Sequence, residues 1–263
     1  MFLSIRLTFL LTFPLLFACK APKPVAQHTA LVPYGPAFAA LWQQRSAEYK
    51  ALCFQAYNIA RLRLNENLKS SFPKPMAIVT DIDETILDNS PYNVHVALKG
   101  ENYSDKTWQE WTSKATADTV PGALSFLKYA AEKGVHVYYI TNRSEAERGV
   151  TLQNLQRWNF PDADNEHLIL KTTTSSKEER RLHVAQTHEI ILLMGDNLGD
   201  FSAIFEKQPA DKREAATKQS AAEFGSRFIV LPNPMYGDWL PALFQYNYKQ
   251  NIDSILQTQL RNY

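Results

Sequence analysis

Residues 76–85 read Met76-Ala77-Ile78-Val79-Thr80-Asp81-Ile82-Asp83-Glu84-Thr85. The apolar, β-branched run at 76–81 is typical of a buried strand. Two carboxylates, Asp81 and Asp83, close this run, although buried strands seldom end in paired acids because charges need partners or solvent. At the carboxyl end of a parallel strand, however, acids face the crevice in which α/β proteins bind their ligands. The sequence therefore predicts a metal site with a nucleophile beside it at the end of this strand.

Outward from this strand, the chain alternates between apolar runs and helical patterns. We expect further strands at 135–141, 167–171, 190–195 and 228–231. We expect helices at 36–68, 121–133, 144–158 and 175–188, and a surface helix within the charged, alanine-rich segment 206–224. Such alternation predicts an α/β fold in which helices cover both faces of a parallel sheet.

Residues 1–18 are predicted to be a targeting segment rather than part of the fold. Arg6 supplies a positive charge, and the mostly apolar residues 7–17 are too few to span a membrane comfortably. The segment runs into Leu16-Phe17-Ala18-Cys19, which resembles a bacterial lipoprotein signal, where the cysteine becomes the lipidated first residue of the mature protein. A plain secretory signal with an incidental cysteine is the alternative.

A lipid anchor at Cys19 would hold the protein on a membrane surface, since several acyl chains together bind stably. Lys20 follows the cysteine, so the aspartate that would act as a retention signal for the inner membrane is not at this position. We therefore expect a location in the cell envelope, on the outer membrane of a Gram-negative bacterium. Residues 19–35 hold several prolines and few periodic apolar positions, so we expect them to be the lipidated N-terminus and a tether.

Composition narrows the range of partners. The formal net charge is +1 and no basic block is present, so we expect no nucleic-acid polymer as a partner. The cysteines are Cys19 and Cys53, and a lipidated Cys19 leaves Cys53 as a buried, unpaired small residue. The histidines other than His95 show no metal-ligand spacing, and we expect them to be structural or solvated; they are His28, His136, His167, His183 and His188. The sequence indicates no particular oligomeric state.

Polar groups suited to one reaction follow three of the predicted strands. The first strand ends in the two acids, the second in Thr141-Asn142-Arg143, and the third in Gly195-Asp196-Asn197-Leu198-Gly199-Asp200. Lys177 lies near the start of the helix before the third strand. Each motif alone could be a turn or a helix cap. Because the carboxyl ends of parallel strands meet at one edge of a sheet, we expect these groups to converge.

The order of these motifs is similar to that of the haloacid dehalogenase (HAD) superfamily of phosphohydrolases. More narrowly, the chain resembles the class C, lipoprotein-type acid phosphatases and 5′-nucleotidases. The matching segments are 81–92, 121–123, 139–143, 176–181, 195–201 and 233–237, and the resemblance spans 36–250 together with the lipoprotein signal. It implies a Rossmann-like HAD core with a parallel sheet over 36–263. A small α-helical cap would come from residues 36–70, 88–118 and part of the C-terminus.

The resemblance also assigns roles to the acids. Asp81 is implied to be the nucleophile that forms an aspartyl-phosphate. Mg²⁺ would be held by the side chains of Asp81 and Asp196 and the backbone carbonyl of Asp83, with waters completing its octahedron. Such an ion offsets the repulsion between a carboxylate and a phosphate dianion. The Asp83 side chain would protonate the leaving alcohol and then activate the hydrolytic water.

The remaining motif residues are implied to bind the phosphoryl group. Thr141, Asn142 and Lys177 would hold its oxygens, and the charge of Lys177 would stabilise the group during transfer. Asp200 would orient Lys177 or the metal-bound waters.

Two aromatic residues are implied to bind the leaving group. By resemblance, Trp111 and Tyr236 would sandwich a flat group such as a nucleobase. Trp108 lies three residues before Trp111 and shares its helix face, so packing between the core and the cap is the alternative for at least one of the two tryptophans.

The sequence thus predicts a lipid-anchored, Mg²⁺-dependent acid phosphatase that hydrolyses phosphomonoesters, with nucleoside 5′-monophosphates as a subset of its substrates. One alternative is a phosphotransferase, which passes the phosphoryl group of the same aspartyl-phosphate to an alcohol instead of water. Another is a surface-binding lipoprotein with an idle catalytic centre, although both acids of the first motif are intact.

Overall fold

The computed structural model describes residues 31–261, which are built around a parallel sheet. Its strands are Met76–Thr80 (β1), His136–Ser144 (β4), Leu168–Lys171 (β5), Glu189–Gly195 (β6) and Phe228–Val230 (β7). They lie in the order β5-β4-β1-β6-β7, and each neighbouring pair is parallel. Each strand occupies a segment predicted from the sequence, although β4 continues past Thr141 to Ser144. The expected α/β fold is therefore confirmed.

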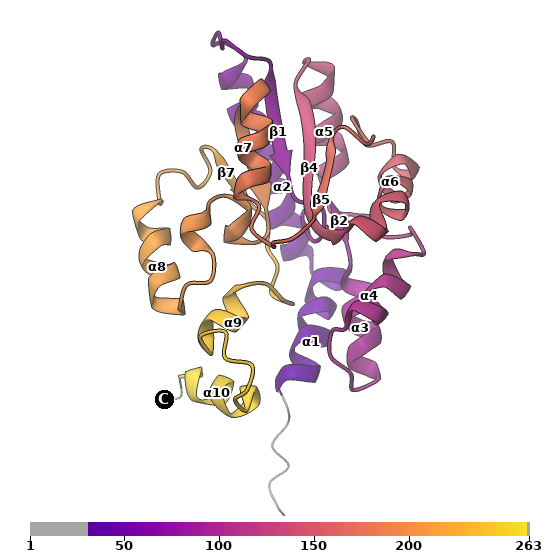
Figure 1. Cartoon of the computed structure of the whole chain (residues 1–263), viewed down its shortest axis with the longest axis vertical. Coiled ribbons are helices and arrows are strands. Elements are labelled where there is room, and N and C mark those ends of the chain that lie inside the picture. The colour runs from indigo at the N-terminus through magenta and orange to yellow at the C-terminus, as the bar shows by residue number, and fades with distance from the viewer. Residues whose placement is uncertain (1–30, 262–263) are drawn as a thin grey trace, which may run out of the picture.

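β1 is the central strand of the sheet, and the acids Asp81 and Asp83 directly follow it (Figure 1). Ile78 packs into one core cluster, whereas Ala77 and Val79 pack into the other. Alternate residues of a strand face opposite sides of a sheet. Both sides of β1 are covered, so an unbroken apolar run is the pattern that this strand requires.

Helices form a layer on each face of the sheet. One face is covered by Ala47–Asn67 (α2), Ala123–Glu132 (α5) and Arg148–Arg157 (α6). The other is covered by Glu178–Thr187 (α7) and Ala210–Gln219 (α8). The two layers bury both faces of the sheet, and in such folds the crevice at the carboxyl ends of the strands is where ligands usually bind.

The N-terminal helical pattern differs from its expected boundaries. It begins at Leu31 rather than residue 36 and divides at Ser46 into α1 (Leu31–Arg45) and α2. The hydroxyl of Ser46 accepts a hydrogen bond from the backbone N–H of Tyr49 at 3.1 Å and so caps α2. The last part of the expected tether is therefore helical. Because α2 packs on the sheet, residues 47–67 belong to the core layer and not to a cap.

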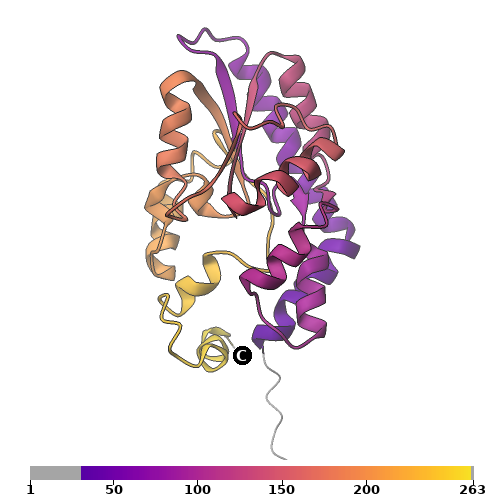
Figure 2. The same ribbon diagram turned by 45° about the vertical axis from the view of Figure 1, so that its right-hand side comes forward.

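The other expected cap segments lie beyond the carboxyl ends of the strands. They comprise α1, Ser90–Leu98 (α3), Asp105–Thr112 (α4), Trp239–Leu243 (α9) and Ile252–Gln259 (α10). A two-stranded antiparallel ribbon, Leu87–Asp88 (β2) with Asp118–Thr119 (β3), joins the 88–118 segment to the core. Figure 2 shows the C-terminal helices α9 and α10 (yellow) on one side of the region beyond the strand ends, and α3 and α4 (magenta) on the other. α10 also contacts α1, so both ends of the described chain meet there.

The predicted signal segment 1–18 and the lipidation site Cys19 lie outside the described residues. Within 31–261, no helix combines the length and apolar character needed to cross a membrane.

Candidate active site

The loop after β1 places two acids, Asp81 and Asp83, at the carboxyl edge of the sheet. The backbone N–H of Asp81 still bonds the carbonyl of Met194 in β6, at 2.9 Å, which fixes Asp81 at the end of the sheet. The chain then turns sharply through Glu84, whose φ of 60° lies in the left-handed region. The N–H of Glu84 bonds the carbonyl of Leu87 at 2.8 Å. This tight turn holds Asp83 beside Asp81 at the carboxyl edge.

Three carboxylates converge at this edge. One oxygen each from Asp81, Asp196 and Asp200 lie within 4.8 Å of one another. Asp196 is held on both sides, because Thr85 Oγ1 donates to its Oδ1 at 3.2 Å and Asn233 Nδ2 donates to its Oδ2 at 2.8 Å. The sequence expectation gave Asp200 only a supporting role, whereas its carboxylate belongs to this group. The side chain of Asp83 lies outside the group.

The electrostatics of the three acids favour a bound cation. Burial, with the charges of Asp200 and Asp83, raises the pKa of Asp81 to about 7 despite the opposing effect of Lys177. Burial and the neighbouring carboxylates raise the pKa of Asp196 well above its ordinary value. Clustered buried carboxylates resist ionising together unless a positive charge joins them. Their oxygens are also the ligand type that a hard divalent cation prefers, so these residues fit the expected metal.

Lys177 supplies one positive charge at the site. Its Nζ forms ion pairs with Oδ1 of Asp81 and, at 2.6 Å, with Oδ1 of Asp200. Burial lowers the pKa of Lys177, but the two carboxylates outweigh this effect and raise it above its ordinary value. The ammonium group is therefore charged and in contact with the expected nucleophile. Its expected contact with phosphoryl oxygens stays a prediction.

Asp83 is held by a residue to which the sequence assigned no role. Arg143 Nη2 lies 2.7 Å from Oδ1 of Asp83, and Arg143 Nε lies 3.2 Å from Oδ2. Asn89 Nδ2 donates to the same Oδ1 at 2.9 Å. The signal for Arg143 was its place directly after Thr141-Asn142 in the second motif. What it contacts, 60 residues earlier in the chain, becomes visible only in the folded protein.

The second motif is divided between the site and its support. Asn142 is exposed and lines the cavity above the acids. Thr141 is buried, and its hydroxyl accepts a hydrogen bond from the N–H of Arg143 at 3.1 Å. Arg180 ties both residues down, because it donates to the carbonyl of Thr141 at 2.6 Å and to Oδ1 of Asn142 at 2.7 Å. Thr141 therefore lies outside the cavity lining, whereas Asn142 belongs to it, and the phosphoryl-binding role of both residues stays a prediction.

A cavity of about 760 Å³ opens over the acids. Its lining includes the aromatic residues Tyr92, Tyr103, Trp108, Tyr236, Tyr246 and Tyr248. Tyr92 and Trp108 meet edge to face, with ring centroids 5.0 Å apart. The Tyr236 hydroxyl is buried and has no hydrogen-bond partner within residues 31–261. The cavity thus combines an acidic floor with aromatic walls, as suits a ligand with one charged and one flat end.

The expectation for Trp111 is wrong in one respect, because this residue lies outside the cavity lining. It packs against the hydrophobic core, and its Nε1 donates to Oδ1 of Asn89 at 2.8 Å. Asn89 in turn contacts Asp83, so Trp111 supports the acid instead of forming a wall. Trp108, on the same helix, takes the wall position. Tyr236 lines the cavity as predicted.

Comparisons with known proteins agree with this geometry. A family model described as HAD superfamily, subfamily IIIB (Acid phosphatase), matches residues 25–239. Two solved structures of the class C acid phosphatase from Bacillus anthracis, one with tungstate bound, are each 42% identical to this chain. Each superposes with a TM-score of 0.85 and covers 88% of this chain and 99% of the other.

A more distant relative is acid phosphatase 1 of Solanum lycopersicum. It is 29% identical over 165 residues, which make up 60% of this chain. The aligned part spans 57% of the tomato protein's own length.

Proposed function

The chain belongs to the acid phosphatases of the HAD superfamily, subfamily IIIB, and from this we propose that it is a Mg²⁺-dependent phosphatase that hydrolyses phosphomonoesters. The observation that carries the proposal is the contact of Lys177 with both Asp81 and Asp200 in a group of three buried carboxylates. Asp81, Asp196, Asp200 and Lys177 all line one cavity, which supports their assignment as nucleophile, metal ligands and cation for the phosphoryl group.

The first step transfers the phosphoryl group to Asp81. A carboxylate oxygen of Asp81 attacks phosphorus, and the bond from phosphorus to the ester oxygen breaks. The leaving oxygen takes a proton from the carboxyl group of Asp83 and departs as an alcohol. Lys177 lies against Asp81 and stabilises the negative charge on the transferring group.

The second step regenerates the enzyme. Water attacks the phosphorus of the aspartyl-phosphate while Asp83 accepts one of its protons, and inorganic phosphate leaves as the bond to Asp81 breaks. Both steps need the Asp83 oxygens at fixed positions. Arg143 and Asn89 supply that constraint, since each donates to Oδ1 of Asp83.

The metal-ligand set follows from the same group of acids. Asp81 and Asp196 would hold Mg²⁺ together with the backbone carbonyl of Asp83, and the carboxylate of Asp200, which lies within 4.8 Å of theirs, would orient the metal-bound waters. When bound, the ion offsets the repulsion between the Asp81 carboxylate and a phosphate dianion. The raised pKa values of Asp81 and Asp196 support this assignment, because a cation lowers the cost of ionising both.

Nucleoside 5′-monophosphates are the substrate subset that we favour. A cavity with an acidic, metal-binding floor and aromatic walls accommodates a phosphate at one end and a flat base at the other. Trp108 and Tyr236 line this cavity, and we propose that they stack on the base, since such stacking tolerates different bases.

A lipid anchor at Cys19 and a location on the outer membrane of a Gram-negative bacterium remain part of the proposal. Their support is the sequence Leu16-Phe17-Ala18-Cys19 and the Lys20 that follows it. The substrate would then be a small phosphomonoester outside the cytoplasm, and the products would be phosphate and an alcohol or nucleoside.

The decisive experiment is a turnover assay with the purified full chain. Wild-type protein with Mg²⁺ should release inorganic phosphate from alkyl, aryl and nucleoside phosphomonoesters, and EDTA should abolish the activity. The Asp81→Asn variant should be inactive, whereas Asp211→Asn, at an exposed position on α8, should match wild type. Wild-type turnover by Asp81→Asn would overturn the mechanism, and turnover unaffected by EDTA would overturn the metal requirement. Phosphorylation of an added alcohol would show that transfer competes with hydrolysis.

A further inference from the structure

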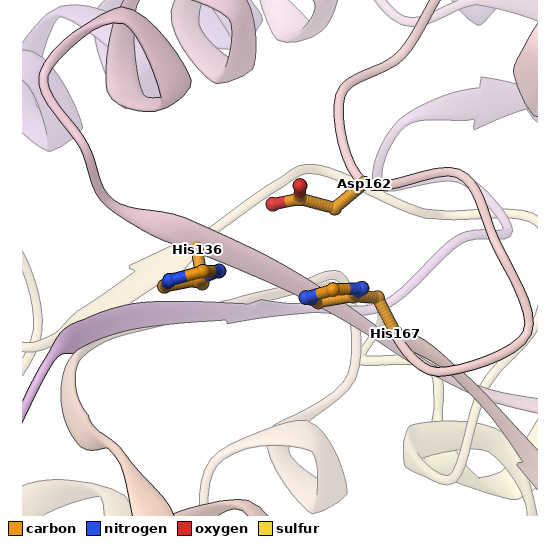
Figure 3. Close-up of side chains that lie close together, drawn as sticks. All are labelled: His136, Asp162 and His167. Carbon is orange, nitrogen blue, oxygen red and sulfur yellow. The ribbon is translucent and has the colours of Figure 1, made fainter.

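A second group of metal-ligating side chains lies at the opposite edge of the sheet from the acids. His136 opens β4, His167 directly precedes β5, and Asp162 lies in the loop between α6 and β5. One ligand atom from each of the three lies within 4.8 Å of the others (Figure 3). We propose that these three residues, termed the histidine cluster, form a binding site for a transition-metal ion of the zinc type, separate from the catalytic site.

The donor types of the histidine cluster suit this class of ion. Imidazole nitrogen and carboxylate oxygen are common ligands of zinc, whereas Mg²⁺ prefers an octahedron of oxygens. The catalytic acids offer carboxylates alone, so the two sites differ in chemistry as well as in place. Three protein ligands with a water in the fourth position complete a tetrahedral zinc centre.

His167 is oriented for ligation by a neighbouring carboxylate. Its Nδ1 lies 2.9 Å from Oδ1 of Asp164, and the same oxygen accepts the backbone N–H of His167 at 3.0 Å. A carboxylate at Nδ1 holds the proton on that nitrogen and leaves the lone pair on Nε2 for a metal. A ligating histidine is commonly held in this way, with its other ring nitrogen bonded to a carboxylate.

Asp162 is also held in place. Its Oδ2 accepts a hydrogen bond from the backbone N–H of Val137 at 2.8 Å, which ties the loop to the start of β4. Its other oxygen is available to a metal. A fixed carboxylate and an oriented imidazole therefore lie close to His136 (Figure 3).

The geometry needs only small side-chain movements to close around an ion. Ligand atoms about 2 Å from a tetrahedral zinc lie roughly 3.3 Å from one another, and those of the histidine cluster already lie within 4.8 Å. The rings of His136 and His167 are nearly parallel, with centroids 5.8 Å apart. His136 is half-buried, and its ring also meets that of His188 edge to face, with centroids 4.9 Å apart, so closure around an ion would include a turn of the His136 ring away from His188.

Sequence spacing does not reveal this group, which is why the histidines were expected to be structural or solvated. Two of the ligands are held near each other by strand pairing, since the N–H of Tyr139 in β4 bonds the carbonyl of His167 at 2.9 Å. A metal ion would therefore join the starts of two adjacent strands to the loop that carries Asp162. Binding to the folded state alone stabilises that state by mass action.

The test is Zn²⁺ binding to the full chain in the presence of excess Mg²⁺, measured by calorimetry and by the midpoint of thermal unfolding. Wild type should bind one Zn²⁺ per chain outside the catalytic site and unfold at a higher temperature. His136→Gln and Asp162→Asn should each weaken that binding by at least about 10-fold. His183→Gln, an exposed histidine on α7, is the matched control and should bind like wild type.

An Asp196→Asn variant separates this site from the catalytic one. It removes a ligand of the proposed Mg²⁺ site and should leave Zn²⁺ binding at the histidine cluster intact, whatever the outcome of the activity assays. Wild-type Zn²⁺ affinity in both His136→Gln and Asp162→Asn would overturn the proposal. Loss of all Zn²⁺ binding in a folded Asp196→Asn protein would overturn it as well, because the ion would then occupy the catalytic acids.

Discussion

The guanidinium group of Arg143 forms a two-nitrogen ion pair with the carboxylate of Asp83, with Nη2 2.7 Å from Oδ1 and Nε 3.2 Å from Oδ2. The Arg143 side chain is 1% exposed and that of Asp83 is 16% exposed, so the pair lies at the boundary between the core and the cavity. A planar, two-nitrogen contact fixes the direction of the carboxylate as well as its position. The proposed general acid is therefore held in place before substrate arrives.

We expect Arg143→Lys to lower kcat/KM for all phosphomonoesters by about 10- to 100-fold, because a lysine keeps the charge but loses the two-nitrogen contact that orients Asp83. Steady-state kinetics with one alkyl and one nucleoside phosphate measure the effect. Arg45→Lys, at an exposed position of α1, should leave kcat/KM for both substrates unchanged. Unchanged kcat/KM in Arg143→Lys would show that orientation of Asp83 is not limiting.

Lys177→Met should reduce both activity and stability. The variant removes the ammonium group that pairs with Asp81 and Asp200. We expect kcat/KM to fall by about 100-fold or more, and the free energy of unfolding to fall by about 3 kcal/mol because two buried carboxylates lose their partner. Phosphatase assays and denaturant titration measure the two effects. Lys212→Met, on the exposed face of α8, is the control, and a fully active Lys177→Met would contradict the role.

Gly195→Ala should disrupt the site through Asp200. A Cβ at Gly195 would overlap the Asp200 side chain, lying 2.6 Å from its Cγ. Asp200 would have to move, although its Oδ2 accepts the N–H of Asn197 at 2.9 Å and its Oδ1 pairs with Lys177. We expect a large loss of kcat and a lower unfolding midpoint.

Gly149→Ala is the matched control for that variant. Nothing lies within 4 Å of a Cβ at Gly149, which is in α6. Gly149 is the second residue of α6, where alanine loses less backbone entropy on folding than glycine, so this variant should keep full activity and be at least as stable as wild type. A Gly195→Ala protein that behaves like Gly149→Ala would show that Asp200 tolerates displacement.

The two tryptophans of α4 should give different kinetic signatures. Trp108→Ala removes a cavity wall, so we expect KM for nucleoside 5′-monophosphates to rise about 10-fold while KM for a small alkyl phosphate stays constant. Trp111→Phe removes the donor to Asn89, which holds Asp83, so kcat should fall for every substrate alike. If Trp111→Phe instead raised KM for nucleotides alone, and Trp108→Ala lowered kcat for every substrate, Trp111 would be the stacking residue.

Cys53 should resist thiol reagents in the folded protein. Its side chain is fully buried, and burial raises the pKa of its thiol to about 11. The raised pKa means that the thiol contributes to stability below its ordinary pKa, and that this contribution is lost as the pH rises through about 11. With Cys19 replaced by Ala, labelling at pH 8 should be slow in buffer and fast in denaturant. Equal rates in both would show that the α2 core opens readily.

Much of the fold followed from local pattern. The five strands of the sheet are short apolar runs, and each depends on residues that adjoin in the chain, so β1, β4, β5, β6 and β7 were predictable within a few residues. The β2–β3 ribbon was not predicted. The division at Ser46 was not, because α1 and α2 share one continuous helical pattern. The Ser46 cap marks the start of α2, and the two helices then pack against different partners, α2 on the sheet and α1 against α3.

The sequence by itself determined the parallel sheet and the meeting of Asp81, Lys177 and Asp196 at its carboxyl edge, because strand direction forces strand ends together. The tertiary structure alone decided that Arg143 holds Asp83 and that Trp108 rather than Trp111 forms the cavity wall. It also decided that His136, Asp162 and His167 form a cluster. These outcomes depend on distances between residues of different elements, which the periodicity of a sequence does not encode. Periodicity indicates which face of a helix or strand is buried, whereas the packing of elements against one another determines which residues that face contacts.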